Sequence, residues 1–447
     1  MTISLGNRAK MSTSTTGTGT ITLGNAVSGF QTFADAGITN GQTVRYAIDD
    51  GANFEIGSGT YTSSGTTLTR SVTESSNSDS AISLSGSAEV FIAATVADLN
   101  PLYIANPSSA TNPTAAGTNA VSIGSGSVAS GEKGFALLGG TASGQYAMAF
   151  NNYAVASAEK SISLGWLTDA TATSAVAIGT GTQSSGSHSV SLGQANASGA
   201  DSFAAAINNS TSSYGATGAN SIAMGNHNKS TGTQSISLGG YNNVSSGNSS
   251  FVTGYQALAS GAYGVAAGFQ AQATEPSTVA LGYQAEASAI YSIAIGNNAK
   301  SAVSRQIAFS AGRFAALGDA QGSIFILRSD TTDATAEAMT TNNSTAAADN
   351  QIVAASDTCI MFSGTIVAMQ NGAADQGGWE IKGLLKNDGG TTTLVSSNIQ
   401  TFAEGNGWAV ALSADNTNNA LKVQVTGEAS HNIRWVANIQ TSEVTYA

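Results

Sequence analysis

Charged residues are scarce in this chain: among 447 residues, 15 are Lys or Arg and 27 are Asp or Glu, together 9%. Ordinary globular proteins contain about 25%. The chain also lacks the 3.6-residue apolar period of helix bundles. It has only four prolines and no Gly-X-Y period, which excludes collagen. Hydrophobic residues still make up 41%, too many for a disordered chain. We therefore expect an all-β protein.

Further absences narrow the possible partners. The net charge is −12, which leaves no basic patch for nucleic acid or an anionic membrane. The single cysteine, Cys359, excludes an intrachain disulfide and a cysteine zinc site, and it lies in an apolar run that predicts burial. No apolar run reaches the roughly 18 residues of a membrane span, so we expect no membrane insertion. The first residues lack a basic segment followed by an apolar one, so we expect no signal peptide and synthesis in a host cytoplasm.

Catalytic residues are also hard to find. The three histidines are His188, His227 and His431, and the first two fall at predicted turns, where a polar side chain faces water. No Ser/His/Asp arrangement is indicated, and the few acids of the repeat region do not align as carboxylate pairs for glycoside cleavage. We therefore expect no enzyme activity, no cofactor and no metal.

A short phrase that ends in glycine recurs through the middle of the chain. Small and large residues alternate in it, as in Ala-Val-Ser-Ile-Gly at 120–124, Ser-Ile-Ser-Leu-Gly at 161–165 and Ser-Ile-Ala-Ile-Gly at 292–296. Its last position recurs mostly every 14 residues between 124 and 310, with one longer spacing of 19 residues. A fixed period of this kind indicates stacked repeats.

The phrase predicts one short strand per repeat, and a second segment, such as 195–199 or 257–261, predicts another. Each unit is then one coil of a β-solenoid, with alanines of the second segment facing the core. We expect the large residues of the phrase to form that core: Val121, Ile123, Ile162, Leu164, Val176, Ile178, Val190, Leu192, Ile222, Met224, Ile236, Leu238, Val279, Leu281, Ile293 and Ile295. Because two apolar side chains per coil make a thin core, we expect neighbouring chains to complete it.

Repeated Ser-Val-Ala-Ile-Gly phrases joined by Ala-x-Ala-x-Gly resemble the head repeat of trimeric autotransporter adhesins, the YadA-like heads. The resemblance covers about 115–310. It implies a left-handed β-roll and a parallel homotrimer of three rolls. The sequence shows neither the heptad stalk nor the C-terminal membrane segment of that family, so we expect a different means of attachment.

Residues 1–100 read as a separate small domain. Turn signals at Asn40-Gly41 and Asp50-Gly51 separate short β-rich runs, which predicts an antiparallel β domain. Its segment 44–61 resembles an N-terminal module of tail-fibre-like virion proteins in marine bacteriophages. The resemblance implies attachment to a phage tail protein or to a portal or adaptor protein. Residues 101–119 are the predicted linker, and 120–310 the predicted solenoid shaft.

From residue 311 to 447 the phrase is replaced by regularly spaced β-rich runs, which predict a jelly-roll-like β-sandwich. Gly-Asp-Ala-Gln at 318–321 and the segment 427–437 resemble C-terminal tip domains of phage fibres. The resemblance implies that this domain binds a host surface glycan or an outer-membrane protein.

The C-terminal domain holds the candidate receptor-binding residues. Trp379 and Trp435 lie in alternating strand patterns that predict burial, whereas the pattern around Trp408 fits a buried or an exposed side chain. Polar loops at 372–377 and 415–419 are candidate contact surfaces. The predicted receptor-binding residues are Trp408, Asp415, Asn416, Asn418 and Asn419.

These observations predict a homotrimeric bacteriophage tail fibre, located in the virion tail, that binds the host without catalysis. Three alternatives remain. A capsid head fibre or decoration protein would have the same composition and differ in location. A bacterial surface adhesin would need export and an anchor. A capsule depolymerase would release oligosaccharides from the host polysaccharide.

Overall fold

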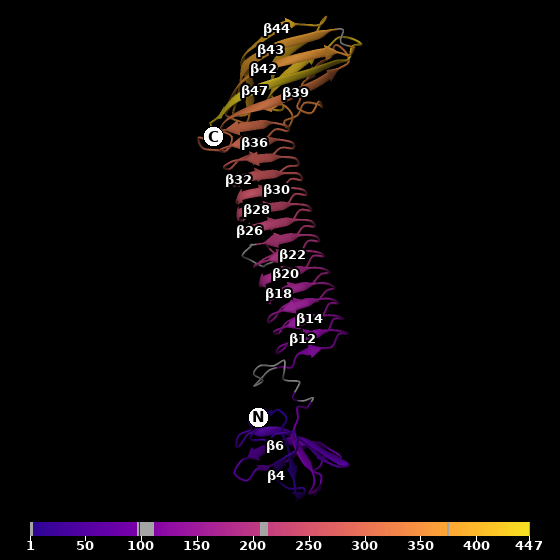
Figure 1. Cartoon of the computed structure of the whole chain (residues 1–447). Coiled ribbons are helices and arrows are strands. Elements are labelled where there is room, and N and C mark those ends of the chain that lie inside the picture. Colours follow the sequence, from indigo (N-terminus) through magenta and orange to yellow (C-terminus); the bar gives the residue numbers. More distant parts are fainter. Residues whose placement is uncertain (1–2, 96–97, 99–110, 206–212, 373–374, 447) are drawn as a thin grey trace. The chain divides into compact units, whose positions relative to one another are not determined.

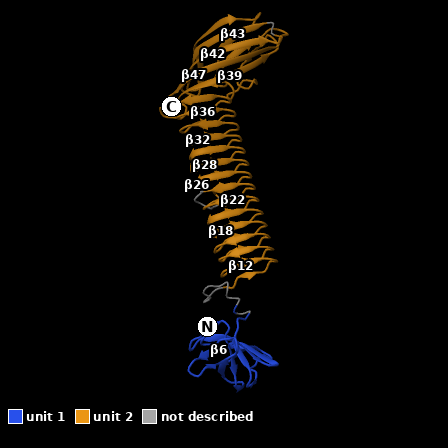
Figure 2. Cartoon of the chain, viewed as in Figure 1, with its two compact units in different colours: residues 1–110 blue, residues 111–447 orange. Residues whose placement is uncertain are grey.

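The computed structural model describes residues 3–95, 98, 111–205, 213–372 and 375–446. The chain divides into two compact units, residues 1–110 and 111–447, coloured separately in Figure 2. The elements of the described residues are all β-strands (Figure 1), so the predicted all-β class is confirmed. Of the predicted linker, residues 101–110 lie outside the described residues.

Unit 1 is a small β-barrel. β5, β10, β2, β4, β7 and β6 pair in turn, and β6 also pairs with β5, which closes the ring. The strands are β1 (Ile3–Ser4), β2 (Lys10–Thr13), β3 (Thr16–Gly17), β4 (Ile21–Ala26), β5 (Thr43–Asp50), β6 (Asn53–Thr62), β7 (Thr67–Leu68), β8 (Ser71–Ser75), β9 (Leu84–Ser85) and β10 (Glu89–Ile92). Buried Glu55 pairs with Arg70 and accepts a hydrogen bond from the Tyr46 hydroxyl at 2.7 Å. The predicted antiparallel β domain is therefore observed.

In unit 2, two parallel ladders of strands form the shaft, the coiled part of the chain from β11 to β38 (Figure 1). The long-strand ladder consists of β12 (Val121–Ile123), β14 (Phe135–Leu137), β16 (Met148–Phe150), β18 (Ile162–Trp166), β20 (Val176–Thr180), β22 (Val190–Leu192), β24 (Phe203–Ala205), β26 (Ile222–Asn226), β28 (Ile236–Tyr241), β30 (Phe251–Tyr255), β32 (Val265–Phe269), β34 (Val279–Leu281), β36 (Ile293–Gly296) and β38 (Ile307–Ser310). Each strand pairs with the strand one repeat further on, so each repeat is one coil, as predicted.

The short-strand ladder lies opposite and contributes two residues per coil. Its strands are β11 (Thr114–Ala115), β13 (Val128–Ala129), β15 (Thr141–Ala142), β17 (Val155–Ala156), β19 (Asp169–Ala170), β21 (Gln183–Ser184), β23 (Asn196–Ala197), β25 (Gly215–Ala216), β27 (Lys229–Ser230), β29 (Val244–Ser245), β31 (Leu258–Ala259), β33 (Gln272–Ala273), β35 (Glu286–Ala287) and β37 (Lys300–Ser301). Because β11 already pairs with β13, the ladder begins inside the segment predicted as linker.

The interior of each coil is filled by small side chains. Ala280 in the middle of β34, and Ala285 and Ala287 on the opposite side, are fully buried, and equivalent Ala, Ser, Thr or Asn residues repeat along the shaft. Buried hydroxyls bond inside the coil: the Ser163 hydroxyl donates to the carbonyl of Thr168 at 2.8 Å. The largest of these buried side chains include Val252 and Asn243, so the space between the two ladders is narrow.

The prediction of which strand face is buried is therefore wrong. The alternation is correct, but the large residues of the phrase point outward and the small residue between them points inward, with the burial pattern intermediate–buried–intermediate in β18 and β22. The residues concerned are those predicted as core: Val121, Ile123, Ile162, Leu164, Val176, Ile178, Val190, Leu192, Ile222, Met224, Ile236, Leu238, Val279, Leu281, Ile293 and Ile295. The narrow interior is instead filled by the smaller residues between them and by those of the opposite ladder.

Glycine ends the phrase because successive coils touch there. Gly268 has φ of +134°, and a Cβ on it would lie 2.1 Å from the carbonyl oxygen of Gly282 in the next coil. Gly247, at the second turn, would place a Cβ 2.0 Å from the carbonyl oxygen of Gly261. A side chain would clash at both of these positions, which explains why glycine recurs there, although Asn151 and Glu275 occupy the corresponding places in other coils.

The tip, residues 311–447, is a two-sheet sandwich, in agreement with the predicted β-sandwich. One sheet continues the long-strand ladder in the order β38-β39-β47-β42-β43-β44. In the other sheet, β46 pairs with each of β40, β41 and β45. The strands are β39 (Ala320–Thr331), β40 (Ala336–Ala338), β41 (Ile352–Val353), β42 (Thr358–Gln370), β43 (Gln376–Asp388), β44 (Thr391–Ala403), β45 (Ala409–Asp415), β46 (Ala420–Thr426) and β47 (Ile433–Thr445). Shaft and tip therefore share one continuous sheet.

The register of the tip sheet fixes its two ends. Ile324 of β39 pairs with Ile307 of the last shaft strand, so the start of β39 adjoins the shaft. The other end of β39 pairs with the start of β47, where Asp330 lies opposite Arg434. The loops after β39, after β42 and before β47 thus gather at the end of the tip away from the shaft.

Candidate functional site

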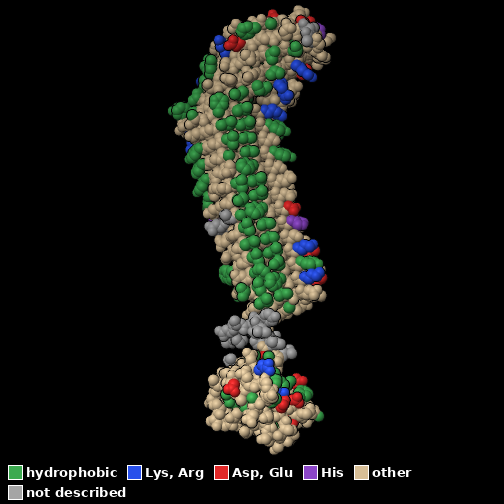
Figure 3. Space-filling model, viewed as in Figure 1, with side chains coloured by type: hydrophobic (Ala, Val, Ile, Leu, Met, Phe, Trp, Pro, Cys, Tyr) green, Lys and Arg blue, Asp and Glu red, His purple; other side chains and the backbone are tan. Residues whose placement is uncertain are grey.

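A continuous apolar stripe runs along the outward face of the shaft (Figure 3). We define the outward stripe as the first and third residues of each long strand. Val121, Met224 and Ile295 are 47%, 41% and 43% exposed, which is high for large apolar side chains. Of the 28 positions only Thr253 is polar: Val121, Ile123, Phe135, Leu137, Met148, Phe150, Ile162, Leu164, Val176, Ile178, Val190, Leu192, Phe203, Ala205, Ile222, Met224, Ile236, Leu238, Phe251, Thr253, Val265, Ala267, Val279, Leu281, Ile293, Ile295, Ile307 and Phe309.

The outward stripe has the character of an association surface. Soluble monomers rarely expose continuous apolar patches of more than a few hundred Å², and larger ones mark contact with another molecule. At about 4.8 Å per coil, fourteen long strands give a stripe of roughly 65 Å. No charged residue interrupts it, and its side chains remain partly exposed within one described chain.

An aromatic ladder lies beside the outward stripe, one ring per coil. The rings of Tyr241, Tyr255, Phe269 and Tyr283 stack at centroid distances of 5.6, 5.4 and 4.9 Å. The two inner rings, Tyr255 and Phe269, have a stacked neighbour on each face. His227 makes an edge-to-face contact with Tyr241 at 5.2 Å, which corrects the prediction that it faces water. We assign this ladder to holding coils together, because stacked rings offer no free face to a ligand.

The prediction that Trp408 contacts a receptor is wrong, because this side chain is buried. It is 2% exposed and packs at 5.5 Å from Trp435, which in turn stacks on Trp379 at 5.4 Å. The three rings form the centre of the tip core, and the predicted burial of Trp379 and Trp435 is observed. The alternation that marked those two was missing around Trp408, because it follows a turn rather than a strand.

The other four predicted receptor residues lie in the loop between β45 and β46. Asp415 accepts a hydrogen bond from the side-chain amide of Asn418 at 2.9 Å. Asn416 accepts one from the backbone N–H of Thr392 at 2.7 Å, and the Thr392 hydroxyl donates to Asn419 at 3.3 Å. The side chains of Asp415, Asn416, Asn418 and Asn419 therefore stabilise their own loop.

This loop also lies at the end of the tip that adjoins the shaft, where a receptor is less accessible. Thr392 pairs with Asn387, which faces Thr358 on the neighbouring strand, and Thr358 pairs with Thr445. Thr445 lies beside Asp319, at the entry of the chain from the shaft. The loop is thus near the shaft, and whether it touches a receptor stays a prediction.

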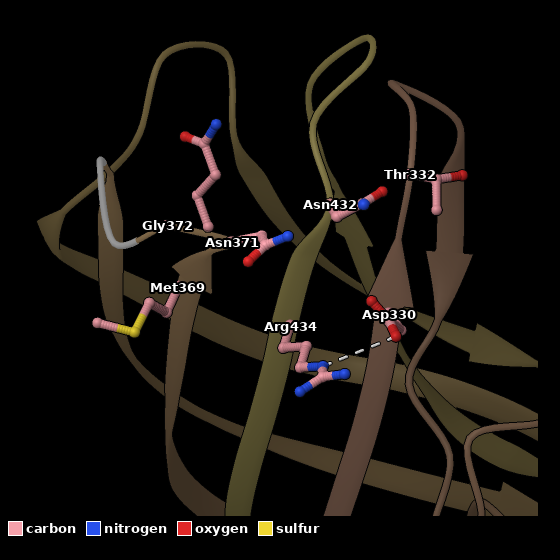
Figure 4. A pocket seen from close by; sticks show the side chains of 8 residues that line it. Asp330, Thr332, Met369, Asn371, Gly372, Asn432 and Arg434 are labelled. Carbon is pink, nitrogen blue, oxygen red and sulfur yellow. Dashed lines mark ion pairs between the residues drawn. The ribbon is translucent and has the colours of Figure 1, made fainter.

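A pocket of about 640 Å³ lies at the opposite end of the tip (Figure 4). Its lining comes from the end of β39, the end of β42 and the start of β47, three segments far apart in the sequence: Asp330, Thr332, Met369, Gln370, Asn371, Gly372, Asn432 and Arg434. The backbone N–H of Asn371 donates to the carbonyl of Asn432 at 2.9 Å, which joins two of the loops. Gly372 belongs to the second loop that the sequence marked as a contact surface, while the other lining residues were missed.

The polar groups of this pocket are weakly engaged with one another. Arg434 Nε and Asp330 Oδ2 are 3.8 Å apart, too long for a hydrogen bond although the strands place them opposite each other (Figure 4). Gln370 Oε1 is shielded from solvent and has no hydrogen-bond partner among the described residues. The exposed side chains of Arg434 and Asp330 therefore keep a donor and an acceptor free in the pocket lining.

Comparison with known families concerns the shaft. The model of the YadA head domain repeat matches residues 115–137, 170–196, 216–242 and 273–299, which together are less than half of the chain. All four segments lie in the coils, so the shaft is a YadA-like β-roll. No curated protein matches the chain. Among the described residues, no helix is long and apolar enough to cross a membrane, and no three His, Cys, Asp or Glu side chains group as metal ligands.

Proposed function

We propose that the chain forms a non-enzymatic bacteriophage tail fibre, a parallel homotrimer that binds the host surface through its tip. Residues 1–100 attach the fibre to a tail protein or to a portal or adaptor protein of the virion, the shaft gives reach, and residues 311–447 contact a host glycan or outer-membrane protein. YadA-like head repeats support the coarser description, an adhesin-like fibre. The phage setting rests on the resemblance of the two flanking domains to virion proteins.

The outward stripe is the observation that carries the self-association part of the proposal. Its large side chains remain partly exposed in one described chain, and burying them contributes roughly 25 cal/mol per Å² of apolar surface. Because the stripe repeats with the coil period, two identical shafts in parallel match each other coil by coil. The number three comes from the resemblance to trimeric heads.

The trimer is tested by charging the outward stripe. Ile178→Asp together with Ile295→Asp places two carboxylates per chain on the apolar face, and we expect the 44.5 kDa chain to sediment as a monomer. The matched control is Gln183→Asp with Gln272→Asp, two exposed positions on the short-strand ladder, which leaves the trimer intact. A wild-type chain that sediments as a monomer at micromolar concentration would refute the proposal.

The virion location separates the phage fibre from its alternatives. Antibodies against the tip would label tails if the proposal is correct. Label on capsids would identify a head fibre or decoration protein instead. Label on bacterial cells free of phage would identify a surface adhesin, an alternative that the YadA-like repeats also fit.

The absence of catalysis is tested on polysaccharide from the host. We expect the full chain to bind this polymer without shortening it, as measured by size-exclusion chromatography of the sugar. A time-dependent release of oligosaccharides would instead identify a depolymerase.

A further inference from the structure

We propose that the pocket at the far end of the tip binds a neutral, hydroxyl-rich saccharide unit of a surface polysaccharide. The inference deepens the proposed function and rests on it, since it names the site and the ligand class. The pocket is not among the receptor residues that the sequence predicted. Its volume of about 640 Å³ lies within the roughly 300–1,000 Å³ of ligand sites.

The uncommitted polar side chains of the pocket are the first argument. All four of these side chains are exposed, and within the described residues Asp330, Asn371, Asn432 and Arg434 make no side-chain hydrogen bond, although each can make several. The tip elsewhere uses such groups internally, as in the loop from Asp415 to Asn419. Here they surround one space and are held there by the strands and by the backbone bond between Asn371 and Asn432 (Figure 4).

A shielded acceptor is a second, independent observation. Gln370 lines the pocket, and its Oε1 is buried without a hydrogen-bond partner among the described residues. A buried acceptor without a donor costs about 1–3 kcal/mol, so such groups are normally paired. Because this oxygen is shielded from solvent, a ligand hydroxyl reaches it and removes the penalty only when the Gln370 side chain turns into the pocket.

The charges of the pocket select the ligand class. Arg434 would attract an anion, but Asp330, 3.8 Å away, would repel it. A cation would be attracted by Asp330 and repelled by Arg434. A hydroxyl group both donates and accepts, so it fits between the guanidinium and the carboxylate. The exposed side chain of Met369 adds an apolar wall for the C–H groups of a sugar ring.

The position of the pocket fits the same ligand. It lies where β39, β42 and β47 turn at the end of the tip away from the shaft, so a large polymer reaches it without meeting the coils. A site on a polymer also suits a fibre with several tips, because many weak contacts to one surface add up to strong attachment.

The test uses the full-length chain and a panel of defined neutral, amino and acidic mono- and oligosaccharides, with binding followed by saturation-transfer NMR. We expect at least one neutral saccharide to bind. The double variant Asn371→Ala, Asn432→Ala and the single variant Arg434→Met each weaken that binding tenfold or more. Asn398→Ala on exposed β44 is the matched control and leaves binding unchanged.

Three outcomes overturn the inference. The first is that no saccharide of the panel binds. The second is that the pocket variants bind as the wild type does. The third is that inorganic phosphate or sulfate competes with the sugar at millimolar concentration, which would identify an anion site. Binding of the labelled chain to host cells separates this inference from the proposed function. Pocket variants that bind cells normally refute only the saccharide site, whereas a wild-type chain that ignores host cells refutes host recognition itself.

Discussion

The shaft and the tip share one sheet but pack in opposite ways. In the tip, large side chains such as Trp435 and Phe362 are buried between two sheets. The outer faces of these sheets carry more polar groups than the interior does. In the shaft, alanine and serine fill the interior, and the large residues stand outside. The difference lies in the distance between the layers: a sandwich leaves room for large side chains, and a narrow coil does not.

This difference teaches where each region gets its stability. The tip has its own hydrophobic core and can fold as one chain. The shaft buries little apolar surface per coil, so its coils depend on the ladder of backbone hydrogen bonds and on whatever covers the outward stripe. Changes inside the tip core are therefore expected to act on folding, and changes on the outward stripe on association.

The largest expected effect is the loss of a tip tryptophan. Trp435→Ala removes a side chain that is 1% exposed and lowers the free energy of unfolding of the tip by about 3–5 kcal/mol. Trp166→Ala removes a shaft tryptophan that is 48% exposed, and it changes the free energy of unfolding of the shaft by less than about 1 kcal/mol. Urea unfolding followed by far-UV circular dichroism measures both. Equal losses would mean that the two regions do not differ as described.

A methyl group at a coil contact is the next largest change. Gly268→Ala forces a Cβ against the carbonyl of Gly282 at a positive φ, and we expect a loss of about 3 kcal/mol in the shaft. In the tip, Gly378 has open space around it, so Gly378→Ala is expected to be neutral. Calorimetry of the two variants tests this, and a neutral Gly268→Ala would contradict the close approach of coils.

Neighbouring positions on one strand separate folding from association. Ala280→Leu adds volume to a fully buried position and destabilises the shaft by about 2 kcal/mol. Leu281→Ala, on the outward face, leaves the folded chain unchanged and weakens self-association. Thermal unfolding reads the first effect and sedimentation the second. If both variants acted on folding alone, the outward stripe would have no partner.

The smallest expected effect is a difference in response to acid. Hydrogen bonds from Asn418 and the loop backbone outweigh partial burial and lower the pKa of Asp415 in the tip, whereas burial raises the pKa of Asp169 in the shaft. The stabilisation by Asp415 is therefore present above the ordinary Asp pKa and lost as pH falls through the lowered value. The contribution of Asp169 is present below the ordinary pKa and lost as pH rises through the raised value.

Both contributions are small, about 0.5 kcal/mol, because the two groups are partly solvated. Melting curves between about pH 3 and pH 7 for Asp415→Asn and Asp169→Asn should differ from the wild type with opposite signs. Differences of the same sign would contradict the assigned causes.

Much of the fold was predictable because it repeats. The phrase around Val279, Ala280 and Leu281 predicted a strand, its period predicted a coil, and the glycine predicted the turn. Alternation alone does not say which face is inside, since both choices have the same period. The width of the interior decides that, and it depends on the opposite strand, with Ala285 and Ala287, rather than on the phrase itself.

The candidate site was less predictable for a different reason. Asp330 and Arg434 are opposite each other only because β39 pairs with β47, and nothing near either residue in the sequence indicates that pairing. The same register places the loop at 415–419 near the shaft and the loop at Gly372 at the far end. A polar loop is visible in a sequence, but the end of a sandwich on which it lies is not.

The antiparallel pairing of β38 with β39 has one more consequence. A stack of parallel strands that stopped at β38 would leave a bare row of backbone donors and acceptors, which recruits further strands from other molecules. Here β39 occupies that row through Ile307, Ala308 and Phe309 and then turns into the tip. The long-strand ladder is therefore closed at its β38 end. Its length there is set by the number of coils in the chain and not by the addition of strands from other molecules.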